Sequence, residues 1–362
     1  MADGPPGTLL IRNAGAIVSG DLRQPLLNAT SLFIRNGVFE AIGGPEQQAE
    51  VTVDAEGNLV MPGLWDAHHY AYFGDHAPAQ DTWGYMARTV RCGTTSLVSA
   101  GAIDVPGRPR DPQGAKQLAI LSARSWIYDR PMGINVHGEA CIAEPGLVEA
   151  DFAEMAAAGV GRVSFLSALA SREQADWASR QGMLVVAAAV AACDVQADVV
   201  LGADTTSVEV DAGFFGLTLT GNARLAVALL ERVGPERIVL GTSTPSDYGI
   251  VPGGMQDMVR RGIGQWGLAP ESAIALASGN AARAYRLSGG VLTPGQPADI
   301  VIAGVLVGSG AADGLHALAS GEWLAVSMVL TDGEIRFHGE AWPGPARSPA
   351  RLVTDGRGVP SP

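Results

Sequence analysis

A regular alternation of strand-like and helix-like segments is the feature that most constrains the fold of this chain. Between Gly63 and Leu287, short β-prone runs such as TTSLVSA (Thr94–Ala100) are followed by helical runs such as Gln113–Ile127. Further strands are expected at 133–136, 160–166, 183–189 and 237–240, and helices at 147–158, 222–233 and 270–287. Because alternating strands and helices form a parallel sheet, we predict an α/β fold with a (β/α) TIM-like barrel over residues 63–288.

Both ends of the chain have a different pattern. Runs such as TLLIRNAGAIV and AEVTVDAEGNLV read as short strands separated by Asn-Gly, Gly-Gly and Glu-Gly turns. Similar runs return near the C-terminus, at 299–303, 323–330 and 334–338. We therefore predict one small β-sandwich domain built from both termini, residues 1–62 and 289–342. Residues 343–362 are rich in Pro and Gly, and we expect this tail to lie loosely on the surface or against a partner.

Charge and cysteine content exclude several kinds of partner. The sequence has 24 Lys and Arg against 37 Asp and Glu, a formal net charge of −13, which argues against nucleic acid or an anionic membrane. The 3 cysteines are scattered, as is typical of a reducing compartment. The start, MADGPPGTLLIRNAG, lacks the regions of a signal peptide, and the longest apolar run, Met183–Cys193, is too short to span a bilayer. We expect a cytoplasmic protein.

Three stretches resemble the amidohydrolase superfamily. MPGLWDAHHY (Met61–Tyr70) lies where that family has PG-h-h-D-x-H-x-H, with h apolar. GTTSLVSAG resembles its second barrel strand, and ASGNAARAYRLSGGVLTPGQPADIVI resembles its last barrel helix and the return to the sandwich. Within the superfamily, the stretches GDHAPAQ, VPGRPRDPQGAKQLAI, VHGEA and DFAEMAAAGV resemble enamidase. The resemblance covers the chain from Leu9 to His338 and implies metal-assisted hydrolysis of cyclic amides and related C–N bonds.

The superfamily pattern implies metal ligands that this sequence mostly replaces. The pattern has His-x-His on strand one, a carboxylate or carboxylated lysine on strand four, histidines on strands five and six, and Asp on strand eight. By resemblance, His68 is the first His, whereas Tyr70 stands at the second and is a poor zinc ligand at neutral pH. No acid occurs near Ser164, no His in MLVVAAAVAA or near Leu201–Ala203, and Ser243 replaces the Asp. With His68 the one surviving ligand, no metal cofactor is expected.

Several side chains remain as candidates for a site at the barrel mouth. Alternate residues of a strand share a face, so Asp66, His68 and Tyr70 form the best acid–base group available, with Asp66 orienting His68. We nevertheless favour the interpretation that His68 is a relic that hydrogen-bonds inside the mouth. His69 would then point outward in a structural role. Other candidates for lining the cavity follow later strands: His137, Cys193, Asp204 and Ser243.

Three functions are consistent with these residues. The first, which we favour, is a non-catalytic (pseudoenzyme) subunit that forms a homo- or hetero-oligomer with amidohydrolase-like subunits. The second is a metal-independent enzyme that acts on a small cyclic amide or carbonyl compound through His68, Asp66 and Tyr70. The third is a C–N bond hydrolase with a rebuilt single zinc site, made from His68, His137 and either Asp66 or Asp204. Each of them is compatible with a small-molecule ligand.

Overall fold

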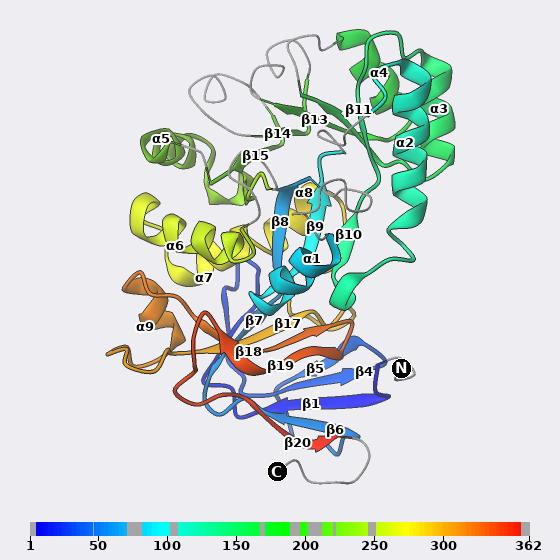
Figure 1. Cartoon of the computed structure of the whole chain (residues 1–362). Helices are drawn as coiled ribbons and strands as arrows, with labels where there is room; N and C mark the ends of the chain where they lie inside the picture. The colour runs from blue at the N-terminus through cyan, green and yellow to red at the C-terminus, as the bar shows by residue number, and fades with distance from the viewer. Residues whose placement is uncertain are drawn as a thin grey trace. The chain divides into compact units, whose positions relative to one another are not determined.

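The computed structural model contains both helices and strands, which confirms the predicted α/β class (Figure 1). The chain divides into two compact units, one of Met1–Trp65, Arg88–Thr95 and Met255–Pro362, the other of Asp66–Ala87 and Ser96–Gly254. The structure describes residues 5–45, 47–70, 82–101, 108–166, 171–188, 196–201, 212–219, 222–244 and 251–355. In this described part, no helix combines the length and apolar composition needed to cross a membrane.

Parallel strands occupy the middle of the chain. One sheet has the order β11 (Ala140–Ile142), β12 (Arg162–Phe165), β13 (Leu184–Ala188), β14 (Val199–Leu201), β15 (Phe214–Leu217) and β16 (Ile238–Leu240). A second sheet contains β10 (Asn135–His137), β9 (Thr94–Ser99) and β8 (Leu64–His69). A parallel bridge joins His69 at the end of β8 to Thr244, which follows β16. Among the described residues, the hydrogen-bonded ladders thus form two sheets, not one continuous closed barrel.

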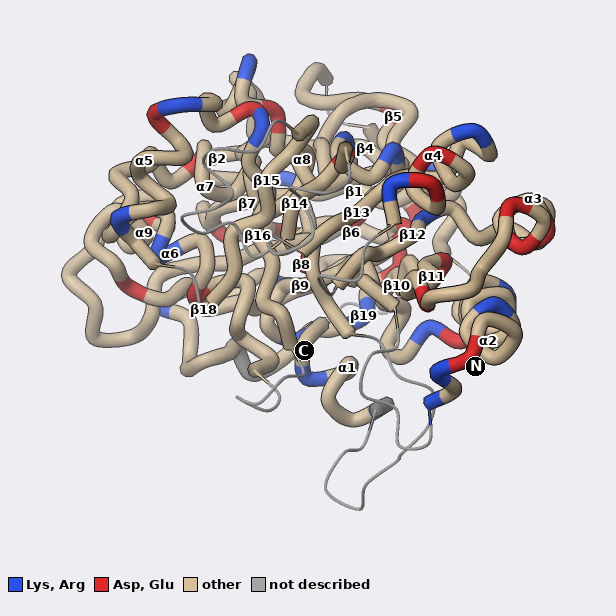
Figure 2. The backbone as a smooth tube through the Cα atoms, turned by 90° about the horizontal axis from the view of Figure 1, so that it is seen from above, with Lys and Arg blue, Asp and Glu red and all other residues tan. Residues whose placement is uncertain are grey.

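Capping residues explain where several helices begin. Asp111 accepts a hydrogen bond from the backbone N–H of Gly114 at the start of α2, and Asn222 caps α5 through the N–H of Arg224. The helices of the central region are α1 (Thr82–Arg91), α2 (Pro112–Ser125), α3 (Glu149–Ala157), α4 (Arg172–Arg180), α5 (Ala223–Val233) and α6 (Gly254–Trp266). The charged residues of α2 are basic, those of α3 are acidic, and α4 carries both signs (Figure 2). An ion pair joins Arg180 of α4 to Glu149 of α3.

The helix predicted over 270–287 is interrupted. It consists of α7 (Pro270–Leu276) and α8 (Gly279–Ala284), and α9 (Gly314–Ala319) follows later in the chain. Ser278, between the first two, has φ −146° and ψ −92°, so its backbone is not helical. Its hydroxyl donates to the carbonyl of Ile274 at 2.7 Å, which satisfies a carbonyl at the end of α7.

Two sheets in the first unit combine strands from both ends of the chain. The sheet β20-β6-β1-β4-β5 is formed by β20 (Arg351–Asp355), β6 (Val51–Asp54), β1 (Thr8–Arg12), β4 (Leu32–Arg35) and β5 (Val38–Ile42). The other consists of β19 (Glu334–Trp342), β18 (Ala325–Thr331), β17 (Ile300–Gly304), β7 (Leu59–Pro62), β2 (Ala16–Val18) and β3 (Leu26–Leu27). One hydrophobic cluster contains Leu9 and Ile11 from the first sheet with Ile300, Ile302 and Met328 from the second, all fully buried.

The C-terminal segment is more ordered than its composition predicts. We expected residues from 343 onward to lie loosely, but β20 pairs antiparallel with β6, and Ala350 is buried. The stretch RLVTD contains β-prone residues, and a sheet edge offers unpaired N–H and C=O groups to such a segment. The predicted loose tail is therefore wrong for residues 351–355, and residues 356–362 lie outside the described part of the chain.

Candidate functional site

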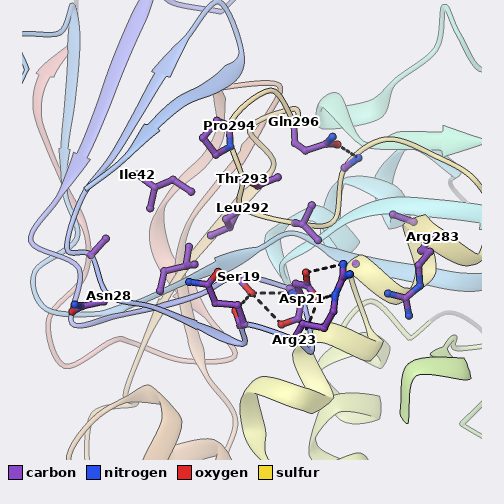
Figure 3. Close-up of a pocket in the computed structure, with 18 of the residues that line it drawn as sticks. Ser19, Asp21, Arg23, Asn28, Ile42, Arg283, Leu292, Thr293, Pro294 and Gln296 are labelled. Atoms are coloured by element: carbon purple, nitrogen blue, oxygen red, sulfur yellow. Dashed lines mark hydrogen bonds and ion pairs between the residues drawn. The ribbon is translucent and has the colours of Figure 1, made fainter. Parts of the chain in front are cut away.

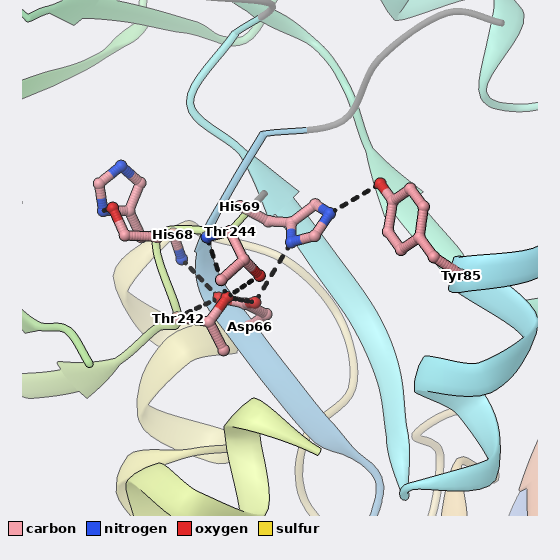
Figure 4. A network of polar contacts seen from close by, with 7 residues as sticks. Asp66, His68, His69, Tyr85, Thr242 and Thr244 are labelled. Atoms are coloured by element: carbon pink, nitrogen blue, oxygen red, sulfur yellow. Dashed lines mark hydrogen bonds and ion pairs between the residues drawn. The ribbon is translucent and has the colours of Figure 1, made fainter. Parts of the chain in front are cut away.

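Asp66, near the end of β8, is buried and uses both carboxylate oxygens. Oδ1 accepts the backbone N–H groups of His68 (3.2 Å) and Thr242 (2.8 Å). Oδ2 accepts the Thr242 hydroxyl and Nδ1 of His69, the latter at 3.3 Å (Figure 4). An ionised carboxylate has about four acceptor positions, so this network occupies its hydrogen-bonding capacity. The carboxylate ties the end of β8 to the segment after β16.

This arrangement differs from the prediction that Asp66 orients His68. The histidine ring that contacts the carboxylate belongs to His69, and Figure 4 shows the rings of His68 and His69 on opposite sides of β8. Adjacent strand residues point to opposite faces, so the rings of His68 and His69 lie on opposite sides of β8. The Asp66 carboxylate contacts His69, three positions later in the chain. His69 is 2% exposed, and its Nε2 lies 3.0 Å from the hydroxyl of Tyr85 on α1. His69 therefore links β8 to a helix, in the structural role expected for it.

His68 has a buried ring with one nitrogen available. Its Nδ1 lies 3.5 Å from the hydroxyl of Ser243, and its ring meets that of Tyr70 edge-on, with centroids 5.1 Å apart. Nε2 is buried and has no hydrogen-bond partner among the described residues. Burial lowers the pKa of His68 to about 4, against the opposing effect of Asp66. The imidazole is therefore neutral at pH 7.

Ser243 has an unusual backbone conformation at this position. Its φ is +61°, in the left-handed region that residues other than glycine rarely adopt. Its backbone N–H donates to the carbonyl of His68 at 2.8 Å, so the conformation is held by pairing with β8. The structure thus brings together His68, Tyr70 and Ser243, three of the residues that the sequence predicted for the site.

His137, at the end of β10, lies beside a partly buried ion pair. The Arg162 side chain on β12 donates from Nη1 to Glu139 Oε1 at 3.0 Å and from Nη2 to the carbonyl of His137. His137 Nδ1 is 3.9 Å from the same Glu139 oxygen. Burial lowers the pKa of His137 to about 4 despite this carboxylate, so the ring is neutral at pH 7. Sequence analysis did not single out Arg162 or Glu139, although Glu139 lies in the stretch VHGEA that resembles enamidase.

The described donors do not fit a divalent metal ion. Within the residues that the structure describes, no group of three or more His, Cys, Asp or Glu side chains is arranged to hold one. Asp66 is occupied by its own network, and Ser164 on β12, near which the sequence analysis expected the strand-four acid, is buried. The candidates Cys193 and Asp204 lie outside the described residues. Tyr85 and Thr242 complete the site and could not have been identified from spacing alone.

The chain is similar over nearly its whole length to one curated protein and to its crystal structure. No family model matches the sequence. Enamidase from Eubacterium barkeri is 33% identical over 383 aligned positions, which cover 95% of this chain and 99% of that protein. Imidazolonepropionase from Klebsiella pneumoniae (strain 342) is 35% identical over 117 positions, 31% of this chain and 28% of that protein.

Solved structures extend the similarity to the fold. The crystal structure of enamidase, described as a new member of the amidohydrolase superfamily, has a TM-score of 0.88 at 31% identity and covers 96% of this chain and 100% of that chain. N-acetyl-D-glucosamine-6-phosphate deacetylase from Mycobacterium smegmatis shares the fold, with a TM-score of 0.62 at 17% identity over 92% of this chain and 100% of that chain. The resemblance seen in the sequence is therefore confirmed: this chain is a homologue of enamidase and belongs to the amidohydrolase superfamily, a family of hydrolases.

Proposed function

We propose that this chain is a non-catalytic member of its superfamily, one that keeps the scaffold and has lost the metal centre. The observation that carries this proposal is the Asp66 network. Its carboxylate accepts hydrogen bonds from four donors, which belong to β8 and to the segment after β16. None of these donors is the ring of His68, so Asp66 does not act as an acidic partner for that ring. A carboxylate in this state supports the strand ends and is not available to coordinate an ion or to orient a base.

We further propose that the parallel strands form a (β/α) barrel. The His69–Thr244 bridge brings the end of β8 beside the segment after β16, and two residues, Gly138 and Glu139, separate β10 from β11 along the chain. If β10 and β11 are counted as one interrupted strand, the two sheets form a single sheet that runs from β8 to β16. The His69–Thr244 bridge then closes this sheet into a ring. The shared hydrophobic cluster of the two terminal sheets supports the β-sandwich of residues 1–62 and 289–342.

One row of side chains across neighbouring parallel strands agrees with a lost metal centre. Parallel partners share a face, and the register aligns Ile142, Ser164, Val186 and Val199 on neighbouring strands. This row contains no carboxylate and no imidazole. Apolar and hydroxyl side chains are weak ligands for zinc, so the row supports a filled or neutral cavity where a hydrolase would hold its ion.

The proposed role is that of a cytoplasmic subunit paired with a second copy or with an amidohydrolase-like enzyme. Cys92 and Cys141 are free and buried, which agrees with a reducing compartment. Leu121, Ile127 and Tyr128, on and after α2, are exposed by 54%, 66% and 87%. Large apolar side chains that are exposed and close in sequence are candidates for a subunit contact.

A second candidate function is supported by the free nitrogen of His68. A neutral His68 ring, with Nδ1 near the hydroxyl of Ser243, an edge-on contact to Tyr70 and a buried Nε2 without a partner among the described residues, would suit a metal-independent acid–base enzyme. Such an enzyme would act on a small cyclic amide or carbonyl compound. Asp66 would support that site through the strand ends and not through a contact with the His68 ring. A rebuilt zinc site would need His68 together with donors outside the described residues, such as Asp204, and ranks third.

The deciding experiment is the metal content of the purified chain, measured by elemental analysis before and after incubation with zinc, manganese or iron and then dialysis. Enamidase from Eubacterium barkeri, treated in parallel, serves as the reference. We expect the chain to retain almost no metal and to leave cyclic amides unhydrolysed. One tightly held ion per chain would refute the proposal in favour of a rebuilt site. Metal-free hydrolysis that is lost in His68→Ala would establish the second candidate instead.

A further inference from the structure

A cavity lies in the first unit, and none of its residues belongs to the site around Asp66. It has a volume of about 680 Å³ and lies between the loop that joins β2 to β3, the helix α8 and the segment 287–296 (Figure 3). Pockets for small molecules have volumes of about 300–1,000 Å³, so this cavity is large enough for such a ligand. Its lining divides into a charged part and an apolar part.

Two arginines and one carboxylate form the charged part. Arg23 donates from Nε and Nη2 to the two oxygens of Asp21, each at 3.2 Å, and Arg283 donates from Nη2 to the side-chain oxygen of Asn280 at 2.8 Å. The charged side chains among the residues that line the pocket, two guanidinium groups and one carboxylate, sum to +1. Although burial raises the pKa of Asp21, hydrogen bonds from Arg23 and the charges of both arginines hold it below its usual value. The cluster is therefore cationic at neutral pH, in a chain whose overall charge is −13.

The apolar part faces the charged part across the pocket. Leu27, Ile42, Leu292 and Pro294 line it, and Figure 3 shows Ile42 and Pro294 on the side away from Arg283. The walls are held by internal bonds before any ligand arrives. The side chain of Gln296 accepts the N–H of Gly289 at 2.8 Å, and the hydroxyl of Ser19 donates to the carbonyl of Gln24 at 2.6 Å. A pocket held in this way loses little freedom on binding.

We propose that this pocket binds a small organic carboxylate with an apolar body. The carboxylate lies at Arg283 and Arg23, and the body packs on Leu27, Ile42 and Pro294. Guanidinium groups present a planar fork that matches a carboxylate, and the bond to Asp21 uses two of the five N–H groups of Arg23. A single negative charge balances the +1 of the cluster, whereas a phosphate dianion would exceed it. This inference does not depend on the proposed loss of catalysis.

Isothermal titration calorimetry on the full chain, with octanoate as the probe, tests the proposal. We expect saturable binding at one site per chain, and little heat from acetate, which lacks the body, or from octanamide, which lacks the charge. Removal of one charge-assisted contact in Arg283→Met should weaken octanoate binding about tenfold or more. Arg286→Met is the matched control, since Arg286 is also exposed, lies just after α8 and does not line the pocket. It should bind octanoate like the unaltered chain.

Three outcomes would overturn the proposal. They are the absence of saturable octanoate binding, binding of octanamide as tightly as octanoate, and unchanged octanoate affinity in Arg283→Met. Circular dichroism of both variants establishes that they are folded. Should Arg283→Met fail to fold, the comparison of octanoate with octanamide on the unaltered chain still decides whether the pocket recognises the charge. Metal content and cyclic-amide hydrolysis are measured separately, so a failure here is distinguishable from a failure of the proposed function.

Discussion

Asp66→Asn and Asp66→Ala test whether the carboxylate at the end of β8 holds the structure together. Asp66 is 2% exposed, and its four donors come from His68, His69 and Thr242. Asn keeps the shape of the side chain but replaces one oxygen with an N–H₂ group. The least costly placement puts this amide at the Oδ2 position, because the Thr242 hydroxyl can turn to accept and His69 can change tautomer. The two backbone donors then keep their acceptor, although it is no longer charged.

The expected cost follows from the number of donors left unmatched. Hydrogen bonds to a charged group contribute about 1.5–3 kcal/mol, and an unsatisfied buried donor costs about 1–3 kcal/mol. These contributions are not additive within one network. We therefore expect Asp66→Asn to lower the free energy of unfolding by about 2 kcal/mol, and Asp66→Ala, which leaves all the donors without this acceptor, by about 4 kcal/mol.

Urea denaturation followed by circular dichroism and fluorescence measures both changes. Glu56→Gln is the matched control, because Glu56 also forms an ion pair, with Arg351, but this pair lies on the surface. Its loss should cost less than about 1 kcal/mol. If Asp66→Ala were within about 0.5 kcal/mol of the unaltered chain, a difference typical of surface substitutions, the carboxylate would not be structural and the argument for a lost active site would fail.

Three further predictions concern other parts of the chain. Gly241→Ala should lower the free energy of unfolding by about 1–3 kcal/mol, because its Cβ would lie 2.6 Å from the backbone nitrogen of His68. Gly264→Ala, in open space on α6, should raise the free energy of unfolding by up to about 1 kcal/mol. Equal urea midpoints for the two variants would contradict this. Lys116→Met should lower the urea midpoint at pH 7. Although burial raises the pKa of Asp151, the backbone N–H of Val148 and the ammonium of Lys116 together hold this pKa below its usual value. The stabilisation by Lys116 is therefore present above the usual pKa of Asp151 and is lost as the pH falls through the lowered pKa. A stability difference between the variant and the unaltered chain that did not shrink in acid would refute it. Deletion of residues 351–362 should speed hydrogen exchange in β6 but not in β4, and unchanged protection of β6 would show that β20 does not cover that edge.

Local sequence patterns were sufficient to place many helices and strands. The run at 94–100 forms β9 (Thr94–Ser99), and the run at 183–189 contains β13 (Leu184–Ala188). The Asn222 cap and the glycine that follows Val233 delimit α5 as predicted. These features depend on neighbours a few residues apart, through β-propensity and capping, and such information is fully present in the chain order. The same reasoning missed the break at Ser278 and the strand β20, where contacts with distant segments outweigh local preference.

The contacts of the candidate site were decided by the tertiary structure. From the sequence, Asp66 and His68 were expected on one face of a strand, and the residues at the other ligand positions of the superfamily pattern led us to expect no metal site. The sequence could not indicate that Asp66 meets Thr242, 176 positions away, or that His69 meets Tyr85. Such partners depend on which strand edges pair and in which register, and a hydrogen bond forms or fails over a few tenths of an ångström. The sequence thus determined the family and the available chemistry, whereas packing determined which of these groups is free to act.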